Sequence, residues 1–343
     1  MENKVVERNM AKQSTIAEEF LARINEENRK SKIMDKAPLI ILLVLAVLMS
    51  VFVQGFFTFT NLINIFNQLS TPLVLTVGLT FVILLGSIDL SIEGVIGYVG
   101  SVVTLLVLNS KTHLDLGVFA ILISVVAGTL VGAVNGFIHV KLRLPSFIVS
   151  FGINGIMYGL AVLSYKGRPA RVIDPLFEQI SHGVLLGIPY LTWFAIFIFI
   201  VGYMIQEYTA FGRHVFAIGD NENVLRSTGI NVDRIKILVF ALSAFCASIA
   251  GIFGAMRLGL GEVAIGNGYL FYAITAVVVG GTSLSGGKGG VVHSLIGTLI
   301  VTIIQNSMIL LGVNAYIQAS IQGIIIILAV AISVQRGKKI IIK

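Results

Sequence analysis

Charge is scarce in this sequence: only 12% of its 343 residues are Asp, Glu, Lys or Arg, against about 25% in a typical soluble domain. A single cysteine, Cys246, excludes a disulfide framework and a site of paired thiolate ligands. The five histidines are scattered without metal-ligand spacing, and no local pattern of Ser, His and Asp indicates nucleophilic catalysis. These shortages exclude an ordinary soluble domain, and we expect neither a metal site nor an enzyme.

Apolar residues take the place of the missing charge. They make up 56% of the chain, and its mean hydropathy is +0.94. Runs of about 20 apolar residues, the length that crosses a bilayer, recur from residue 37 onward. The ten candidate spans are 37–55, 60–86, 92–109, 117–140, 146–164, 190–205, 237–258, 268–281, 290–312 and 316–335. Pro72 interrupts one of them, and 268–281 is too short for a simple crossing. We therefore predict an all-α fold, a polytopic membrane helix bundle of about ten transmembrane helices with some broken or re-entrant.

Basic residues lie mostly between the spans. If the N-terminus is cytoplasmic, 19 of the 24 basic residues face the cytoplasm, and the outer loops hold only five. Those five are Lys111, Lys166, Arg168, Arg171 and Arg257. This asymmetry predicts cytoplasmic termini, and it assigns the net charge of +7 to topology rather than to nucleic-acid binding. The chain then divides into a cytoplasmic amphipathic segment 1–36, a transmembrane domain 37–335 and a cytoplasmic basic tail 336–343.

Two pairs of similar stretches suggest an internal repeat. VNGFIHVKLRLPSFIVS (134–150) resembles QNSMILLGVNAYIQAS (305–320), and the predicted topology puts them at opposite ends of the membrane, as an inverted repeat requires. VILLGSIDLS (82–91) resembles VVVGGTSLS (277–285), but both lie on the same side. Either one similarity is chance, or the span 60–86 is a re-entrant, broken segment.

The cytoplasmic loop 206–236 is polar and contains a short helical stretch, 221–227, that Gly229 ends. This shape suits a docking element, although an ordinary loop fits these features too.

Polar side chains inside the spans are candidates for a solute path. Asp89 ends an apolar run, where a carboxylate is retained either to accept hydrogen bonds from a solute or to cap the next helix. Glu93, four residues on, is expected to complement the dipole of that helix. A hydroxyl-rich, glycine-rich segment at 280–290 suits either a cavity wall at membrane depth or tight helix packing. The candidate pathway residues are Asp89, Ser91, Asn135, Thr282, Ser283, Ser285 and Asn306.

Six stretches carry a specific resemblance. They are GSIDLS (86–91), LPSFIVSFG (144–152), FGRHVFAIGDNENVLRSTGINV (211–232), LSAFCASIAGIFGAMRLG (242–259), AVVVGGTSLSGGKGG (276–290) and LGVNAYIQASIQGIIIILAV (311–330). In order and spacing they resemble the ribose-type ABC sugar permeases, which import ribose, xylose, arabinose or galactose. The resemblance covers residues 60–335. It implies the permease subunit of an ATP-driven ABC importer that translocates a sugar across the bacterial plasma (inner) membrane.

The resemblance also implies partners. These are an ABC ATPase subunit with two nucleotide-binding halves, an extracytoplasmic sugar-binding protein, and a second permease copy in a homodimer or in a heterodimer with a paralogue. ATP and Mg would bind the ATPase, so this chain would hold no cofactor; GGTSLSGGKGG itself lacks the spacing of a P-loop. The segment 219–230 would be the coupling helix, seated in a groove of the ATPase. Its coupling residues would be Gly219, Asn221, Glu222, Arg226 and Gly229.

Departures from the family pattern leave the solute open. The stretch 270–273 lacks two acids that members usually carry, and Ile92 and Glu93 replace a small residue and a glycine. The alternative is an ABC permease for a non-sugar solute of autoinducer or nucleoside type. The rival from another class is an ion-coupled secondary transporter, for which Asp89 and Glu93 are the candidate coupling acids.

Overall fold

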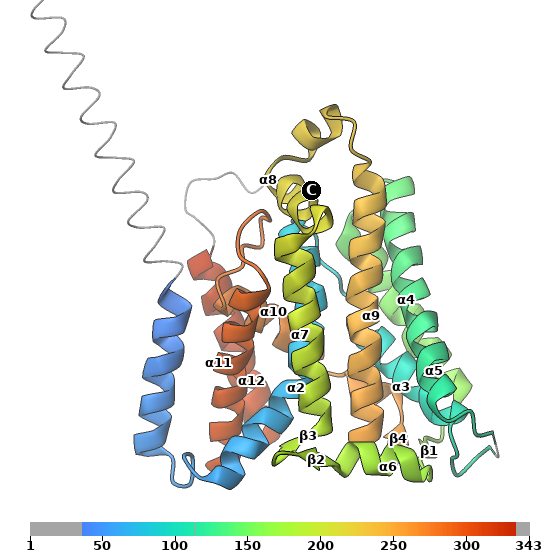
Figure 1. Ribbon diagram of the computed structural model, residues 1–343, viewed down its shortest axis with the longest axis vertical. Helices are drawn as coiled ribbons and strands as arrows, with labels where there is room; N and C mark the ends of the chain where they lie inside the picture. The colour runs from blue at the N-terminus through green and yellow to red at the C-terminus, as the bar shows by residue number, and fades with distance from the viewer. Residues whose placement is uncertain (1–35, 113, 334–343) are drawn as a thin grey trace, which may run out of the picture.

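The structure, a computed structural model, describes residues 36–112 and 114–333 (Figure 1). The predicted cytoplasmic segment 1–36, apart from Lys36, and the basic tail 336–343 lie outside the described residues. The described part is a bundle of helices with two small antiparallel strand pairs. These pair β1 (Ala170–Arg171) with β4 (Leu260–Gly261), and β2 (Val184–Leu185) with β3 (Ile188–Pro189).

Six helices of the described part are long and apolar enough to cross a membrane. They are α2 (Phe59–Leu84), α4 (Val118–Lys141), α5 (Ser146–Ser164), α7 (Tyr190–Tyr208), α9 (Val232–Leu258) and α11 (Val291–Leu310). Further apolar helices are Lys36–Phe52, α3 (Ile92–Leu106), α10 (Tyr269–Val279), which a 3-10 turn η1 (Val263–Gly266) precedes, and α12 (Ala315–Ser333). The predicted all-α membrane bundle is confirmed.

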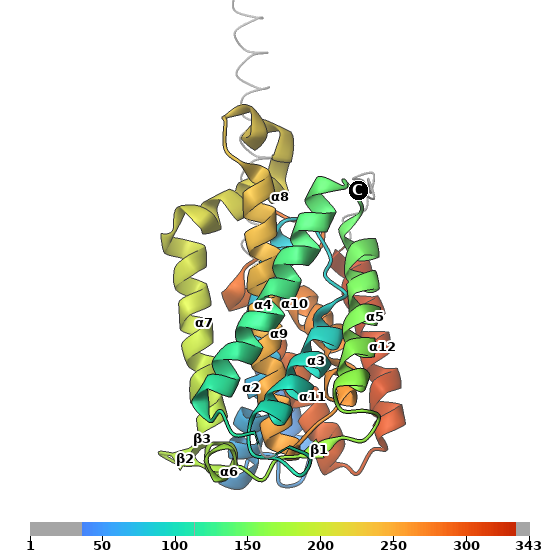
Figure 2. The ribbon, with the colours of Figure 1, turned by 90° about the vertical axis from the view of Figure 1, so that its right-hand side faces the viewer.

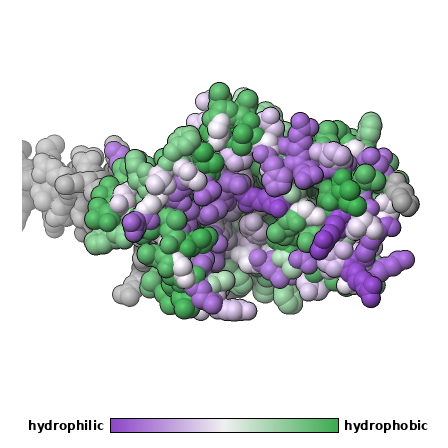
Figure 3. Space-filling model, turned by 90° about the horizontal axis from the view of Figure 1, so that it is seen from below, coloured by the Kyte–Doolittle hydropathy of each residue, from purple (hydrophilic) through white to green (hydrophobic). Residues whose placement is uncertain are grey.

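The two ends of the bundle differ. α8 (Ala210–Ser227) stands at one end, and α6 (Pro175–His182) lies with the strands at the other (Figure 1). Near the α6 end, two loops that carry basic residues are joined, because the Ser110 amide donates to the Arg171 carbonyl at 2.9 Å. Seen from below, strongly hydrophilic residues gather at the right-hand side of this end (Figure 3). The exposed basic residues of these loops are Lys111, Lys166, Arg168 and Arg171.

The central packing depends on small residues, among them Gly128, Gly132 and Gly136, which recur every four residues along α4. These glycines of α4 face α9, and a Cβ on any of them would overlap atoms of α9. Close backbone approach of this kind stabilises helix pairs in lipid, where no hydrophobic drive brings helices together. The α4–α9 pair is therefore closely packed.

The expectation that Pro72 interrupts a span is wrong. Pro72 lies inside α2, which runs through 26 residues, about 39 Å, without a break. A buried position between neighbouring helices makes proline tolerable inside a membrane helix. The break comes later, at 85–91, where the chain leaves α2 and crosses irregularly to the start of α3.

α3 and α10 are half-helices that begin inside the bundle (Figure 2). Their 15 and 11 residues give lengths of about 22 and 16 Å, less than the ~30 Å of a hydrocarbon core. Asn154, at the middle of α5, accepts the Gly94 amide at 2.7 Å, which sets the start of α3 halfway along the bundle. The two half-helices run toward opposite ends, as the two halves of an inverted repeat do.

Both similar pairs of stretches have a place in this arrangement. The stretches 134–150 and 305–320 lie at opposite ends of the bundle (Figure 1). The stretches 82–91 and 277–285 lie close together, because the Gly287 amide, just past the second, donates to the Leu84 carbonyl at 2.9 Å. The re-entrant part is the segment 85–91, and α2 itself is not broken.

Candidate functional site

Asp89 sits in a closed polar cluster. Its carboxylate accepts hydrogen bonds from the Ser91 amide at 3.0 Å, the Ser91 hydroxyl at 2.6 Å and the Asn135 amide group at 3.3 Å, all on Oδ1. Ser243 of α9 donates to Oδ2 at 2.9 Å. All four residues are buried, with at most 1% exposed. Four donors from the segment itself, α4 and α9 therefore replace water around this carboxylate, and no basic side chain of the described residues pairs with it.

Asp89 lies at the start of α3 and makes its hydrogen bonds within the chain. Ser91 is the N-cap residue of α3, but its side chain makes no cap hydrogen bond to the helix, and its amide donates to the Asp89 carboxylate. The carboxylate thus holds the turn that starts α3. Since Asp89, Ser91 and Asn135 are all 0% exposed, none of the three faces solvent in this conformation of the chain.

The irregular segment is held by a row of polar side chains on α5. The row repeats every four residues, so it lies along one face of the helix. Its side-chain oxygens accept hydrogen bonds from three backbone amides. The pairs are Ile88 to Ser146 at 3.2 Å, Leu90 to Ser150 at 2.9 Å and Gly94 to Asn154 at 2.7 Å. Backbone amides at membrane depth need such partners, because no water is available there. The serines were part of the motif 144–152, and their spacing was the signal that sequence reasoning missed.

Glu93 joins the two half-helices. It lies in the first turn of α3, as expected, but its Oε1 accepts the amides of Gly268 at 2.9 Å and Leu270 at 3.1 Å. These amides belong to the N-terminus of α10, whose own N-cap residue, Gly268, supplies no side chain. Glu93 therefore caps α10 from another part of the chain.

The glycine-rich segment 280–290 lies at the α8 end of the bundle, not at its centre. Thr282 is buried and its hydroxyl accepts the Gly290 amide at 3.2 Å, while Ser283 accepts the Ser285 amide at 3.3 Å. Gln206 of α7 accepts the first amide of α11, that of Val291, at 2.7 Å. The hydroxyls thus hold the segment's own turns, and Ser285 is exposed.

Asn306 belongs to a polar row on α11. It forms a reciprocal pair of hydrogen bonds with Asn61 of α2, each 3.0 Å long, and both residues are buried. The row repeats every four residues and consists of Ser294, Thr298, Thr302 and Asn306. Its partners are Thr80, Thr76, Tyr272 and Asn61 respectively. This row ties α11 to α2 and α10, and its hydroxyl members were also missed in the sequence.

The seven candidate pathway residues therefore fall into three places. Asp89, Ser91 and Asn135 lie together. The hydroxyls of 282–285 lie at the α8 end, and Asn306 lies in a row that joins helices. A single cluster lined by all seven does not exist in this structure.

The predicted coupling segment begins within a kinked helix, α8. Sequence analysis predicted the helical stretch 221–227, but α8 begins earlier, at Ala210, and kinks at Asn221 (φ −155°, ψ 97°). The Asn221 side chain caps the second part by accepting the amides of Asn223 and Val224 at 3.2 and 3.3 Å. Gly229 follows with φ +83°, a left-handed conformation that favours glycine. The predicted start and stop of the short helix are thus both present.

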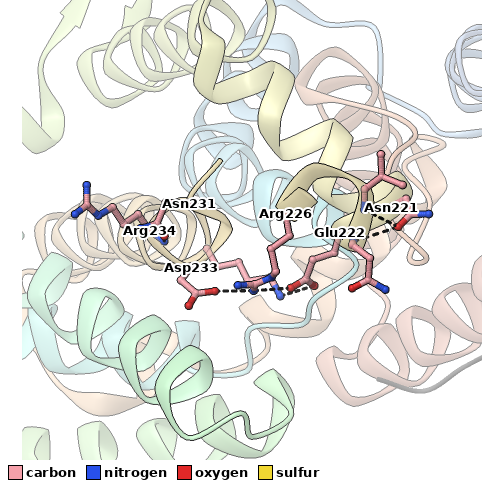
Figure 4. A network of polar contacts seen from close by, with 9 residues as sticks. Asn221, Glu222, Arg226, Asn231, Asp233 and Arg234 are labelled. Carbon is pink, nitrogen blue, oxygen red and sulfur yellow. Dashed lines mark hydrogen bonds and ion pairs between the residues drawn. The ribbon is translucent and has the colours of Figure 1, made fainter. Parts of the chain in front are cut away.

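Ion pairs fix this short helix to α9 (Figure 4). Arg226 lies between Glu222 at 3.0 Å and Asp233 at 2.6 Å, and Lys236 reaches Glu222 at 2.7 Å. Partial burial raises the pKa of Glu222, but hydrogen bonds from Lys236 and Arg226 outweigh it, so this pKa lies below its ordinary value. Arg226, one of the predicted coupling residues, is half-exposed and already bound to two acids of its own chain.

Gly219 brings the coupling segment against the rest of the site. A Cβ there would overlap the Leu84 carbonyl and lie 2.5 Å from the Gly287 amide. The coupling segment, the end of α2 and the glycine-rich segment therefore meet at one point. Among residues 36–112 and 114–333, no group of three or more His, Cys, Asp or Glu could hold a metal ion.

Known proteins match this chain over most of its length. Residues 61–330 match the family described as branched-chain amino acid transport system / permease component. The ribose import permease protein RbsC of Escherichia coli K12 is 36% identical over 88% of this chain and 94% of its own length. RbsC of Haemophilus influenzae is 34% identical over 90% of this chain and 95% of its own length. The L-arabinose transport system permease protein AraH of E. coli K12 is 34% identical over 85% of this chain and 88% of its own length. No solved structure matches.

Proposed function

This chain belongs to that permease family as a ribose-type ABC permease subunit, and we propose that it moves a monosaccharide, delivered by an extracytoplasmic binding protein, into the cell. The observation that carries the proposal is the extent of the match, since relatives named for ribose import align with 88% and 90% of the chain. Proteins of this family work with an ATPase and a binding protein, so ATP and Mg belong to the ATPase chain.

The partner arrangement is a second permease copy beside this one. Gly152, Gly155 and Gly159 of α5 support it, because a Cβ on any of them would have no atom within 4 Å among the described residues. Small residues on a membrane helix suit close approach of another helix. A second copy, identical or paralogous, would cover this face.

The orientation follows from the charge count, which puts α8 and both termini in the cytoplasm and the α6 end outside. The coupling segment 219–229 then seats on the ATPase. We place the solute path along the irregular segment 85–91 and the first turn of α3, with its cytoplasmic exit near Ser283 and Ser285, beside the coupling segment. Its support is that irregular backbone inside a membrane marks transport sites.

The test is uptake of D-ribose into liposomes that contain this chain, its ATPase and its binding protein. We expect uptake that needs all three proteins and ATP. Uptake driven by an ion gradient into liposomes holding this chain alone would overturn the proposal in favour of a secondary transporter. ATP-dependent uptake of a nucleoside, with none of any monosaccharide, would favour the alternative solute. Labelling with a membrane-impermeant thiol reagent checks the orientation: Lys166→Cys should react from outside cells and Ser227→Cys should not.

A further inference from the structure

Glu93 differs from Asp89 in its surroundings, although both are acids at membrane depth. The Glu93 side chain is only partly buried, and its Oε2 receives no hydrogen bond from any described residue. Asp89 is 0% exposed, with donors on both oxygens. Asn267, next to the amides that Glu93 binds, is exposed. Glu93 therefore has one carboxylate oxygen, Oε2, that is free to accept a hydrogen bond from a molecule at this depth in the bundle.

The position of Glu93 is central along the membrane normal. The neighbouring Gly94 amide is bound by Asn154, which has eight residues of α5 on one side and ten on the other. Gly266, just before α10, packs so closely on the Glu93 carbonyl that a Cβ would overlap it. The carboxylate thus lies where the two half-helices start, far from both surfaces.

Two helix N-termini meet at this carboxylate. Each N-terminus carries the equivalent of about half a positive elementary charge, so α3 and α10 together present about one. Such half-helix ends attract anionic solutes in transporters that leave them open. Here the Glu93 carboxylate lies against the start of α10 and Asp89 lies at the start of α3, so two acids offset that charge. No basic side chain of the described residues pairs with Glu93.

We propose that Glu93 is a charge-selective residue of the solute path, which makes its centre suitable for neutral polyhydroxylated solutes and removes its attraction for anions. The proposal rests on the proposed function, because it takes this segment as part of the path. Oε1 holds the two helix starts together, and Oε2 accepts a hydroxyl of the passing solute. Sugar acids and sugar phosphates are the solutes it disfavours.

The test reads the local potential directly and needs no identified solute. Asn267→Cys is made in a Cys246→Ser background and assembled with the ATPase and the binding protein in liposomes. Its labelling rates by an anionic sulfonate and a cationic trimethylammonium methanethiosulfonate are compared in each nucleotide state. Glu93→Gln keeps an oxygen that accepts the Gly268 and Leu270 amides but removes the charge. We expect it to raise the ratio of anionic to cationic labelling about tenfold, because nearby charges at membrane depth are weakly screened.

Glu262→Gln is the matched control. Glu262 is also a partly buried acid and lies in the same loop as Asn267, but it makes no hydrogen bond to α10. This control should shift the ratio less than Glu93→Gln does, and an equal shift would show that the effect is not specific to Glu93. An unchanged ratio in Glu93→Gln, or no labelling of Asn267→Cys in any state, overturns the proposal. D-ribose uptake by the parent complex is measured in parallel. If uptake fails while the labelling ratio still shifts, the proposed solute is wrong and the role of Glu93 in setting the charge stands.

Discussion

Ser243 of α9 donates a hydrogen bond to the Asp89 carboxylate at 2.9 Å, across 154 positions of sequence. α9 begins at Val232, directly after the coupling segment, and the ion pairs of Glu222 and Asp233 fasten that segment to its first turns. Asp89 in turn holds the start of α3. A displacement of the coupling segment by the ATPase would thus reach the irregular segment through one continuous helix.

Ser243→Ala should destabilise the chain and weaken coupling. It leaves Asp89 Oδ2 buried without its donor, which costs about 1–3 kcal/mol for an unpaired polar group and more for a charged one. We expect a lower thermal midpoint in detergent and less ATP-driven transport per ATP hydrolysed. Ser248→Ala is the matched control, because the Ser248 hydroxyl is also buried in α9 but donates only to Ala244 of its own helix. Equal effects of the two changes would show that the contact with Asp89 has no special role.

Gly229→Val should disrupt the coupling segment while the permease still inserts. Gly229 has φ +83°, which a β-branched residue strongly disfavours, although nothing lies within 4 Å of an added Cβ. Strain of about 1–3 kcal/mol is expected from the backbone alone. Gly229→Asn is the control, since asparagine tolerates left-handed backbone. We expect poor co-purification of the ATPase, or hydrolysis without transport, for the valine variant only.

Local features of this molecule could be read from the sequence, and contacts between distant segments could not. Apolar runs gave the helices, and Asn221 and Gly229 marked the short coupling helix, because caps and stops act within a few residues. The amides that Glu93 binds lie 175 and 177 positions away, and nothing local pointed to them. Pro72 misled us because a proline buried among membrane helices does not end a helix. The four-residue spacing of Ser146, Ser150 and Asn154 was readable but needed a known partner to be interpreted.

Arg226→Glu should release the short helix from α9. It places a third acid between Glu222 and Asp233, where Arg226 now forms an ion pair with each. We expect ATPase activity to lose its stimulation by the loaded binding protein. Arg234→Glu, an equal change of charge one residue from Asp233, is the control, because no ion pair of Arg234 occurs among the described residues. If Arg226→Glu and Gly229→Val both keep full assembly and coupling, the loop 141–145 becomes the candidate docking site.

The same ion pairs set a dependence on pH. Since the pKa of Glu222 lies below its ordinary value of 4.5, its carboxylate stabilises the folded segment at pH values above 4.5. That contribution is lost only as the pH falls through the lowered pKa. Co-purification of the ATPase should therefore not change between pH 8 and about pH 6 through Glu222. A loss of co-purification in that range that Glu222→Gln abolishes would contradict this assignment.

Asn306→Leu separates a structural role of this amide from a role in the solute path. Alone, it leaves the Asn61 side chain without its partner in a buried position, although Asn61 still donates to the Phe56 carbonyl at 2.8 Å. Hydrogen bonds between membrane helices contribute about 0.6–2 kcal/mol, so we expect a measurable loss of thermal stability. The double variant Asn61→Leu with Asn306→Leu removes both polar groups, and an apolar pair of this kind is nearly neutral for stability. Because the reciprocal pair joins α2 to α11 and faces no solvent, we expect the double variant to recover D-ribose uptake and part of the stability, less the lost hydrogen bond to the Phe56 carbonyl. Recovered stability with lost uptake would instead assign Asn306 to the path.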